Sequence, residues 1–197
     1  MTKADVYLLE AEGRRYAVKD FRCRPLLVRA TVGRWSMRRE QRAYDALRNV
    51  PGVPELVSRP HPLVLVIAFV DGPSLAAWER GRSLPDGFFG GLKALLAAVH
   101  DRGVVQGDLH HRDVLVGEDG KPWLVDFSTS MVGGPGGGPL RRRMWKLLAG
   151  NDRRSVLKLQ ERFEPGTVTE AERAEMQELP KVYRVAQGFR RLLRPGG

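Results

Sequence analysis

Two aspartates, Asp113 and Asp126, flank a short segment that has the pattern of a hairpin. Strand-like residues follow Asp113 and precede Asp126, and the pair Asp119 and Gly120 between them predicts a tight turn. If these two residues form the turn, Asp113 lies directly opposite Asp126 at the open end of the hairpin. A bulge at Pro122 would shift this register by one residue.

Opposed side chains in such a hairpin have Cβ atoms about 5 Å apart. Two carboxylates at that distance repel each other unless a cation lies between them, and Mg²⁺ is the hard, oxygen-liking ion that fits. Asp108 lies just upstream, in a segment that no helix or strand pattern includes. A third acid beside a metal pair suits a base that orients an attacking hydroxyl. In the alternative interpretation the three aspartates have no catalytic or metal-binding role: Asp108 and Asp113 are ordinary loop and helix-cap residues, and Asp126 ends a strand.

The first segment of the chain is predicted to form a hairpin. Asp5–Ala11 is rich in apolar residues, Glu12 and Gly13 follow as a turn, and residues 14–21 continue as a second strand. Because side chains alternate along a strand, Ala17 and Lys19 lie on the same face of the second strand.

Residues 35–48 have a helical pattern. Met37, Tyr44 and Leu47 recur at steps that place them on one stripe of a helix, and Glu40 lies on the same stripe. A carboxylate on an inward-facing stripe needs a cationic partner, since a buried unpaired charge is costly.

Residues 63–70 form a continuous apolar run, which is typical of a strand buried on both faces. Residues 71–74 then contain Gly and Pro and form the best candidate for a hinge between two lobes. Leu92, Leu96 and Val99 follow with the spacing of an amphipathic helix.

The glycine-rich run 133–138 is predicted to have no regular structure of its own. The remainder of the chain is predicted to be helical. Helix starts are expected at three places: Asn151 with Asp152, Thr169 with Glu172 as a capping box, and Pro180.

The composition is that of a globular protein. The chain has 197 residues, a hydrophobic share of 42% and one cysteine, Cys23, which cannot form an internal disulfide. The chain start lacks the apolar core of a secretion signal, and the apolar run 63–70 is too short to span a bilayer. We therefore expect a cytoplasmic protein.

The formal net charge is +10, which attracts polyanions unless it only reflects a source that favours arginine codons. The predicted last helix carries Val182, Phe189 and Leu193 on one side, with Arg190 and Arg191 elsewhere. This helix either packs on the core or lies on the inner face of an anionic membrane. A nucleic-acid partner is not favoured, because the sequence has no zinc motif and no recognition-helix signature.

The ordered set of motifs resembles the kinase-like superfamily over approximately residues 5–165. Asp108, Asp113 and the Asp126-Phe127 pair resemble the catalytic loop and the metal-binding Asp-Phe-Gly of protein kinases. The variant GDLH at 107–110 is closer to RIO-type kinases, lipopolysaccharide-core sugar (Kdo) kinases and aminoglycoside phosphotransferases. YAVKDF at 16–21, RREQRAYDAL at 38–47 and LVIAFVDGPSL at 65–75 resemble the lysine strand, the glutamate helix and the adenine hinge. Within this superfamily, the segment PGVP at 51–54 and the helical stripe that contains Glu40 are more similar to the Kdo kinases.

The resemblance implies an α+β, bilobal protein-kinase-like fold with a small antiparallel-sheet N-lobe and a shortened, mainly helical C-lobe. It implies one domain over residues 1–197, with an N-lobe at about 1–70, a hinge at about 68–74 and a C-lobe at about 75–197. The implied roles are as follows: catalytic Asp108, Lys19 and Glu40; ATP-binding Ala17, Lys19, Ala68, Val70 and Asp126; Mg²⁺-binding Asp113 and Asp126.

The expected activity is ATP- and Mg²⁺-dependent phosphate transfer to a hydroxyl of a sugar, a glycolipid or another small acceptor. The positive net charge of the chain would suit an acceptor that is phosphorylated or acidic. A protein Ser/Thr acceptor stays open. Asp113 stands where the family has Asn, Gln106 replaces the usual His, and Ser128 replaces the Gly of Asp-Phe-Gly. No glycine-rich phosphate loop precedes Lys19. These departures favour the alternative, a pseudokinase that binds nucleotide or acts as a scaffold without turnover.

Overall fold

The computed structural model describes residues 4–78, 82–136 and 138–177. The elements of the first lobe are β1 (Asp5–Ala11), β2 (Arg14–Asp20), α1 (Leu26–Val28), the π-helix η1 (Arg29–Gly33), α2 (Arg34–Ala46), β3 (Leu56–His61) and β4 (Val64–Ala68). The elements of the second lobe are α3 (Phe88–Asp101), β5 (Val104–Val105), β6 (Val114–Val116), β7 (Pro122–Leu124), β8 (Met131–Val132), α4 (Pro139–Phe163) and α5 (Glu170–Gln177).

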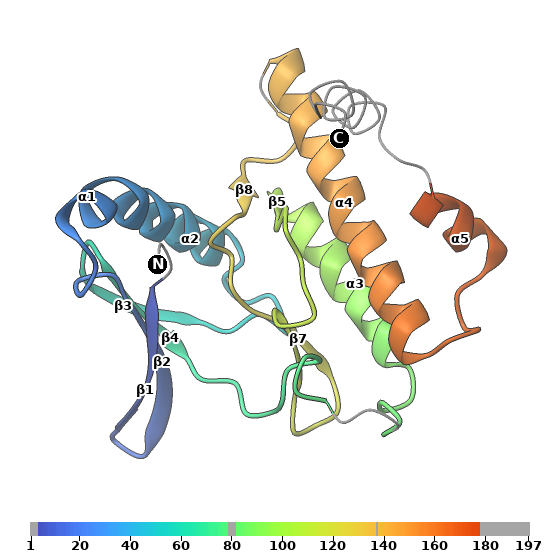
Figure 1. Ribbon diagram of the computed structural model, residues 1–197, viewed down its shortest axis with the longest axis horizontal. Helices are drawn as coiled ribbons and strands as arrows, with labels where there is room; N and C mark the ends of the chain where they lie inside the picture. Colours follow the sequence, from blue (N-terminus) through green and yellow to red (C-terminus); the bar gives the residue numbers. More distant parts are fainter. Residues whose placement is uncertain (1–3, 79–81, 137, 178–197) are drawn as a thin grey trace, which may run out of the picture.

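The first lobe is an antiparallel four-stranded sheet in the order β1-β2-β4-β3, with α2 lying against it (Figure 1). The β1–β2 hairpin turns at Glu12 and Gly13, whose φ angles of 52° and 71° are those of a type I′ turn. The predicted hairpin is therefore confirmed. In the strand predicted to be buried on both faces, Leu65 and Ile67 are both buried.

The helix predicted over residues 35–48 begins earlier. Helical backbone starts at Leu26, directly after Pro25, and continues through η1 into α2. Proline favours helix starts. Of the apolar residues in this first part, Leu26, Leu27 and Val32 are exposed and only Val28 packs partly on the core, so periodicity shows no inward stripe. The predicted stripe of α2 is confirmed, because Met37 and Tyr44 are buried.

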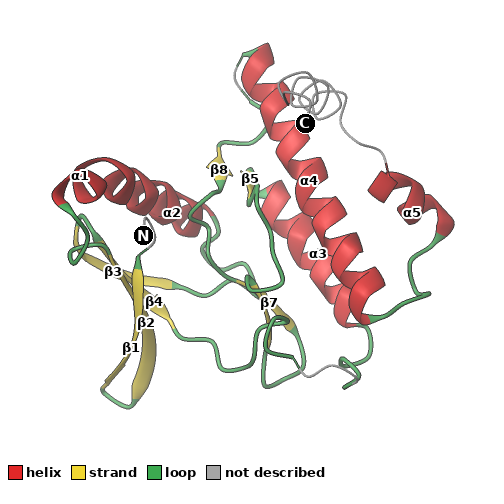
Figure 2. Ribbon diagram, viewed as in Figure 1, coloured by secondary structure: helices red, strands yellow, loops and turns green. Residues whose placement is uncertain are grey.

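The second lobe is mainly helical, with α3 and α4 packed side by side (Figure 2). Its described strands form two short antiparallel pairs, β5–β8 and β6–β7. The helix start predicted at Asn151 and Asp152 is wrong, because both residues lie inside α4. That helix begins at Pro139, where the glycine-rich run ends. The predicted capping box is confirmed: Thr169 N–H donates to Glu172 and Glu172 N–H donates to Thr169 Oγ1.

A single cluster of buried apolar side chains runs through both lobes, from Met37 and Leu65 to Leu92 and Phe127. The α+β, two-lobed architecture predicted from the sequence is therefore confirmed. No helix within the described residues is long and apolar enough to cross a membrane. The helix predicted after Pro180, with its apolar side, lies outside the described residues.

Candidate active site

Lys19 lies at the centre of a charged cluster between the lobes. Its Nζ atom is 2.5 Å from Glu40 Oε1 and 2.9 Å from Asp126 Oδ1. Glu40 is completely buried, and Asp126 is the more exposed partner. Three segments that are far apart in the sequence, β2, α2 and the loop after β7, thus meet at one ammonium group.

The charges of this cluster stabilise one another. Burial alone would lower the pKa of Lys19, but the negative charges of Glu40 and Asp126 outweigh it and raise that pKa above its ordinary value. Burial would raise the pKa of Asp126, yet the Lys19 charge and hydrogen bonds from Lys19 and Ser128 lower it. Lys19 is therefore cationic and Asp126 anionic at neutral pH.

The backbone of Asp126 holds an unusual conformation that aims its carboxylate at Lys19. Its φ of 62° lies in the left-handed region, which non-glycine residues seldom occupy outside functional sites and turns. Ser128 N–H donates to Asp126 Oδ1 at 3.3 Å, and the Phe127 ring contacts the Tyr44 ring of α2 edge to face at 5.3 Å. Packing on both lobes thus maintains the strained backbone.

The predicted pairing of Asp113 with Asp126 is wrong by one residue. Val114 pairs with Leu124 in the β6–β7 hairpin, and Val125 N–H donates to the Asp113 carbonyl at 2.9 Å. The turn has three residues rather than two, because Gly120 adopts a left-handed φ of 76° after Glu118 and Asp119. This extra residue places Asp113 opposite Val125, and Asp126 one position beyond the pairing.

Asp113 and Asp126 nevertheless interact electrostatically. Burial, and to a lesser degree the charge of Asp126, raises the pKa of Asp113 to about 6, although a hydrogen bond from His110 N–H to Asp113 Oδ2 at 2.8 Å opposes the shift. Among the described residues, no group of three or more His, Cys, Asp or Glu side chains is arranged to hold a metal ion. Two carboxylates fit Mg²⁺ all the same, since this ion commonly takes one or two of them and completes its shell with waters and phosphate oxygens.

Asp108 lies at the surface, with its side chain 68% exposed. Asp152 of α4 fixes the segment that carries Asp108. The backbone N–H groups of Gln106 and Gly107 donate to Asp152 Oδ2 and Oδ1, both at 2.8 Å. Gly107 has a positive φ of 83° and thereby turns the chain toward solvent at Asp108. The exposed carboxylate, whose Oδ1 atom lies 3.6 Å from His110 Nδ1, thus faces solvent while the backbone before it is fixed.

Asp152 is the residue of this site that sequence reasoning missed. It is fully buried in α4 and, besides the two backbone donors, lies 3.2 Å from His100 Nε2 of α3. Because Asp and Asn are both common at helix starts, the sequence predicted a helix start at Asn151 and Asp152. It did not indicate that Asp152 accepts hydrogen bonds from a distant loop. A helix that starts at Pro139 would instead place Asp152 in the interior of that helix, where a buried carboxylate must have hydrogen-bond donors around it.

Gln106, which stands where the kinases that the sequence resembles have His, links the segment of Asp108 to that of Asp126. Its side chain is buried, and Nε2 donates to the carbonyls of Val125 and Asp126 at 2.9 and 3.2 Å. Thr129 Oγ1 in turn donates to the Gln106 carbonyl at 2.9 Å. The substitution therefore leaves a direct connection between the segment of Asp108 and that of Asp126.

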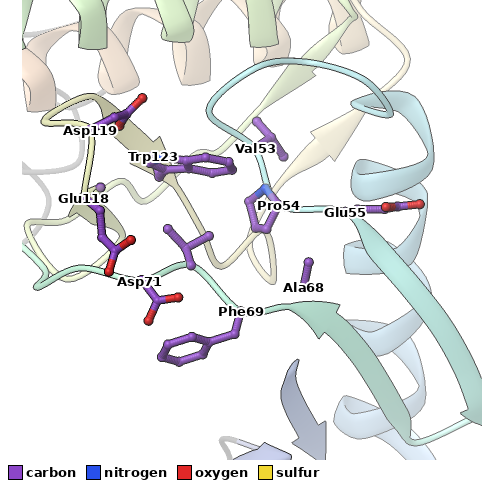
Figure 3. Close-up of a pocket in the computed structure, with 11 residues that line it drawn as sticks. Val53, Pro54, Glu55, Ala68, Phe69, Asp71, Glu118, Asp119 and Trp123 are labelled. Atoms are coloured by element: carbon purple, nitrogen blue, oxygen red, sulfur yellow. The ribbon is translucent and has the colours of Figure 1, made fainter. Parts of the chain in front are cut away.

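The predicted hinge residues Ala68 and Val70 line a cavity of about 500 Å³. Figure 3 shows the segment of Ala68 and Phe69 on one side of it, with Pro54 and Trp123 across from that segment. Ala68 N–H already donates to the Glu55 carbonyl at 2.8 Å, whereas Val70 N–H has no acceptor among the described residues.

Ala17, the remaining predicted ATP contact, does not line this cavity. It pairs with Ile67 of β4. Neither Lys19 nor Asp126 lines the cavity, so the residues proposed for phosphate contact lie apart from it.

The fold resembles that of solved protein kinases. The chain aligns with two structures of the Rio2 kinase from Chaetomium thermophilum, each with a TM-score of 0.63 and 16% sequence identity. The first, a complex with ADP, Mg²⁺ and phosphoaspartate, matches over 90% of this chain, and the chain spans 58% of its length. The second matches over 95% of this chain and 71% of its own length.

The fold is therefore kinase-like, although identity at this level shows the fold alone. No protein-family model matches the chain, and no curated protein matches it. The leaning toward the lipopolysaccharide-core kinases stays a prediction.

Proposed function

We propose that this protein is an ATP- and Mg²⁺-dependent phosphotransferase that moves the γ-phosphate to a hydroxyl of a sugar, a glycolipid or another small acceptor. The observation that carries the proposal is the convergence of Glu40 and Asp126 on Lys19 in a kinase-like fold. A buried carboxylate that fixes a lysine beside a second, more exposed carboxylate suits a site that binds a triphosphate with its metal.

Nucleotide binding divides between the two lobes in this proposal. Lys19 holds the phosphates, because Glu40 keeps its ammonium in place and charged. Ala17 contacts the base from the sheet, and the hinge meets its polar edge through backbone groups at Ala68 and Val70. The unpartnered N–H of Val70 is the donor available for a ring nitrogen.

Asp113 and Asp126 are the residues that would hold Mg²⁺, which neutralises charge on the transferring phosphate when bound. Phosphate oxygens would take over the contact of Lys19 that Asp126 now makes, and this frees Asp126 for the metal. The pKa of about 6 leaves Asp113 mostly ionised at neutral pH and therefore able to act as a ligand.

Asp108 orients the acceptor hydroxyl and accepts its proton as the acceptor oxygen bonds to the γ-phosphorus and the β–γ bridge bond breaks, with ADP leaving. The net charge of +10 favours an acceptor that is acidic or phosphorylated.

A pseudokinase is the second candidate. The observation in its favour is the position of the Glu12–Gly13 turn: Lys19 pairs with Val6 at the far end of the β1–β2 hairpin, so this turn does not supply a glycine-rich loop at the phosphates. In that case the protein would bind nucleotide, and the Lys19–Asp126 ion pair would persist without turnover.

Nucleotide titration with and without Mg²⁺, followed by an assay of ADP release, separates the two candidates. For the wild type we expect Mg²⁺-dependent ATP binding and ADP release. In Asp126→Asn we expect a loss of turnover of at least about a hundredfold. Asp45→Asn, an exposed acid of α2, serves as the control. Binding without ADP release from any sugar, lipid or protein acceptor would favour the pseudokinase, and absence of nucleotide binding would exclude both.

A further inference from the structure

Large apolar side chains are exposed where the first lobe begins its long helix. Leu27 of α1 is 80% exposed and Trp35 of α2 is 61% exposed, and Leu26 is also exposed. Trp35 lies on the side of α2 opposite to that filled by Met37 and Tyr44, and the two leucines precede it in the same continuous helical segment. Adjacent exposed side chains of this size mark an interaction site more often than an ordinary surface.

Arginines surround these apolar residues. Arg34, Arg38 and Arg42 follow one another at steps of four along α2 and are exposed. None of the three belongs to an ion pair within the described part of the chain, although nearby Arg48 pairs with Asp45. The outer side of this helix therefore combines leucine and tryptophan with uncompensated positive charge.

This helix is directly connected to the segment that follows Asp126. The Arg39 guanidinium stacks on Trp35 at 4.5 Å and donates to the carbonyls of Thr129 and Ser130. On the other side of that segment, Arg141 of α4 donates to the Val132 carbonyl at 2.7 Å. Figure 1 shows β8 between α2 and the first turns of α4.

The first turns of α4 repeat the same combination of side chains. Leu140 is 75% exposed and Met144 is exposed, with Arg142 and Arg143 between them also at the surface. Through Arg39 of α2 and Arg141 of α4, the segment 129–132 thus connects two helical segments that each expose apolar and cationic side chains. We call the exposed residues of both the α1–α4 surface: Leu26, Leu27, Arg34, Trp35, Arg38, Leu140, Arg142, Arg143 and Met144.

We propose that the α1–α4 surface docks on an anionic lipid bilayer. Leucine and tryptophan insert at the boundary between headgroups and acyl chains, while arginines reach the phosphates of the lipids. A nucleic acid would use the arginines but has no apolar environment for Leu26 and Leu27, because its affinity derives mainly from its phosphates. The combination of exposed arginines and exposed apolar side chains therefore favours an anionic lipid bilayer over a nucleic acid as the partner of this surface.

Docking would place the segment after Asp126 at the membrane, where a glycolipid acceptor resides. Only this consequence rests on the proposed phosphotransferase activity. Membrane binding itself depends on residues outside the proposed active site, so it can be tested without turnover.

Co-sedimentation of the full chain with vesicles tests the proposal. Vesicles of phosphatidylcholine alone are compared with vesicles that also contain phosphatidylglycerol. We expect binding to the anionic vesicles that weakens with added salt. The double variant Leu26→Ser/Leu27→Ser should bind them about tenfold more weakly or worse, because two inserted side chains are lost.

The control is Val6→Ser/Leu8→Ser, which removes two exposed apolar side chains of β1, away from the α1–α4 surface. It should retain vesicle affinity within about twofold of the wild type. Equal loss in both double variants, or no binding to anionic vesicles, would overturn the proposal. Tight binding to RNA that is unchanged by the leucine substitutions, with none to vesicles, would identify a nucleic-acid surface instead. Unchanged ATP titration of the leucine variant separates this outcome from any failure of the proposed phosphotransferase activity.

Discussion

At the scale of single residues, the candidate site depends on how buried charges are compensated. Glu40 is completely buried and has Lys19 as its cationic partner at 2.5 Å. A buried pair of this kind contributes little net stability, but removal of one partner leaves a charge without compensation. The pair therefore fixes the position of the ammonium more than it stabilises the fold. Asp126 adds a second anion to the same ammonium, at a point that remains accessible to solvent.

Asp113 should make stability depend on pH. Its folded-state pKa of about 6 lies above the ordinary value of 3.8, so the folded state binds protons more tightly and loses stability as pH rises through this window. Asp113→Asn removes the ionisable group and still offers an acceptor for His110 N–H. We expect it to raise the free energy of unfolding by about 1 kcal/mol above pH 6, with a gain that shrinks toward pH 4.

Urea denaturation of both proteins at a series of pH values from about 5 to 8 measures this difference. A constant difference at all pH values would contradict the assignment to ionisation of Asp113. In the wild type, Mg²⁺-dependent ATP affinity should fall as the pH drops below about 6, since the protonated carboxyl is a poor ligand.

At the scale of elements, α4 positions the segment of Asp108 from within the second lobe. Asp152 projects from the middle of this helix and accepts two backbone hydrogen bonds from Gln106 and Gly107. Because α3 and α4 pack together, His100 of α3 also meets Asp152. The loop that carries Asp108 is thus tied to the most regular part of the molecule.

Asp152→Ala should therefore lower the free energy of unfolding by about 3 kcal/mol, because two buried N–H groups lose a charged acceptor. It should lower kcat more than it weakens ATP binding, since the loop of Asp108 would lose its support. Urea denaturation and amide hydrogen exchange of Gln106 and Gly107 measure the effect. Asn151→Ala, one residue away and bonded to Arg154, is the matched control. If both variants were equally stable, the support attributed to Asp152 would be refuted.

At the scale of the whole molecule, the segment that the sequence predicts as the hinge packs closely on the second lobe. Leu75 N–H donates to the Val114 carbonyl, and Val116 N–H donates to the Pro73 carbonyl, both at 2.9 Å. Gly72 lies at this junction with a φ of 140°, and a Cβ atom there would be 1.9 Å from the Val116 carbonyl oxygen. The hinge therefore approaches the β6–β7 hairpin more closely than any side chain allows.

Gly72→Ala should cost more than about 3 kcal/mol of unfolding free energy and weaken ATP binding, because the hinge must move away from the hairpin. Gly87→Ala is the matched control, since Gly87 also has a positive φ, of 74°, but has nothing within 4 Å of a Cβ atom. That control should cost about 1 kcal/mol. Thermal unfolding of both variants compares them, and equal shifts would show that close packing at the hinge is unimportant.

The sequence by itself was sufficient for features that depend on neighbouring residues. The β1–β2 hairpin, the inward stripe of α2 and the capping box at Thr169 follow from turn chemistry, helical period and side-chain hydrogen bonding, which act over a few positions. The order of motifs also predicted the two-lobed fold. The charge on the stripe at Glu40 indicated that a cation must lie opposite, and the resemblance to kinases named Lys19, which the structure places 2.5 Å from Glu40.

Only the tertiary structure decided how distant segments meet. The left-handed Gly120 added one residue to the hairpin turn and moved Asp113 out of register with Asp126, a choice that the local sequence left open. Asp152 gained its role because the packing of α4 brings it beneath Gln106, 46 positions away in the sequence. Lys19 and Asp126, 107 positions apart, meet for the same reason. Such contacts depend on burial of the shared core, and short-range sequence patterns contain no information about their geometry.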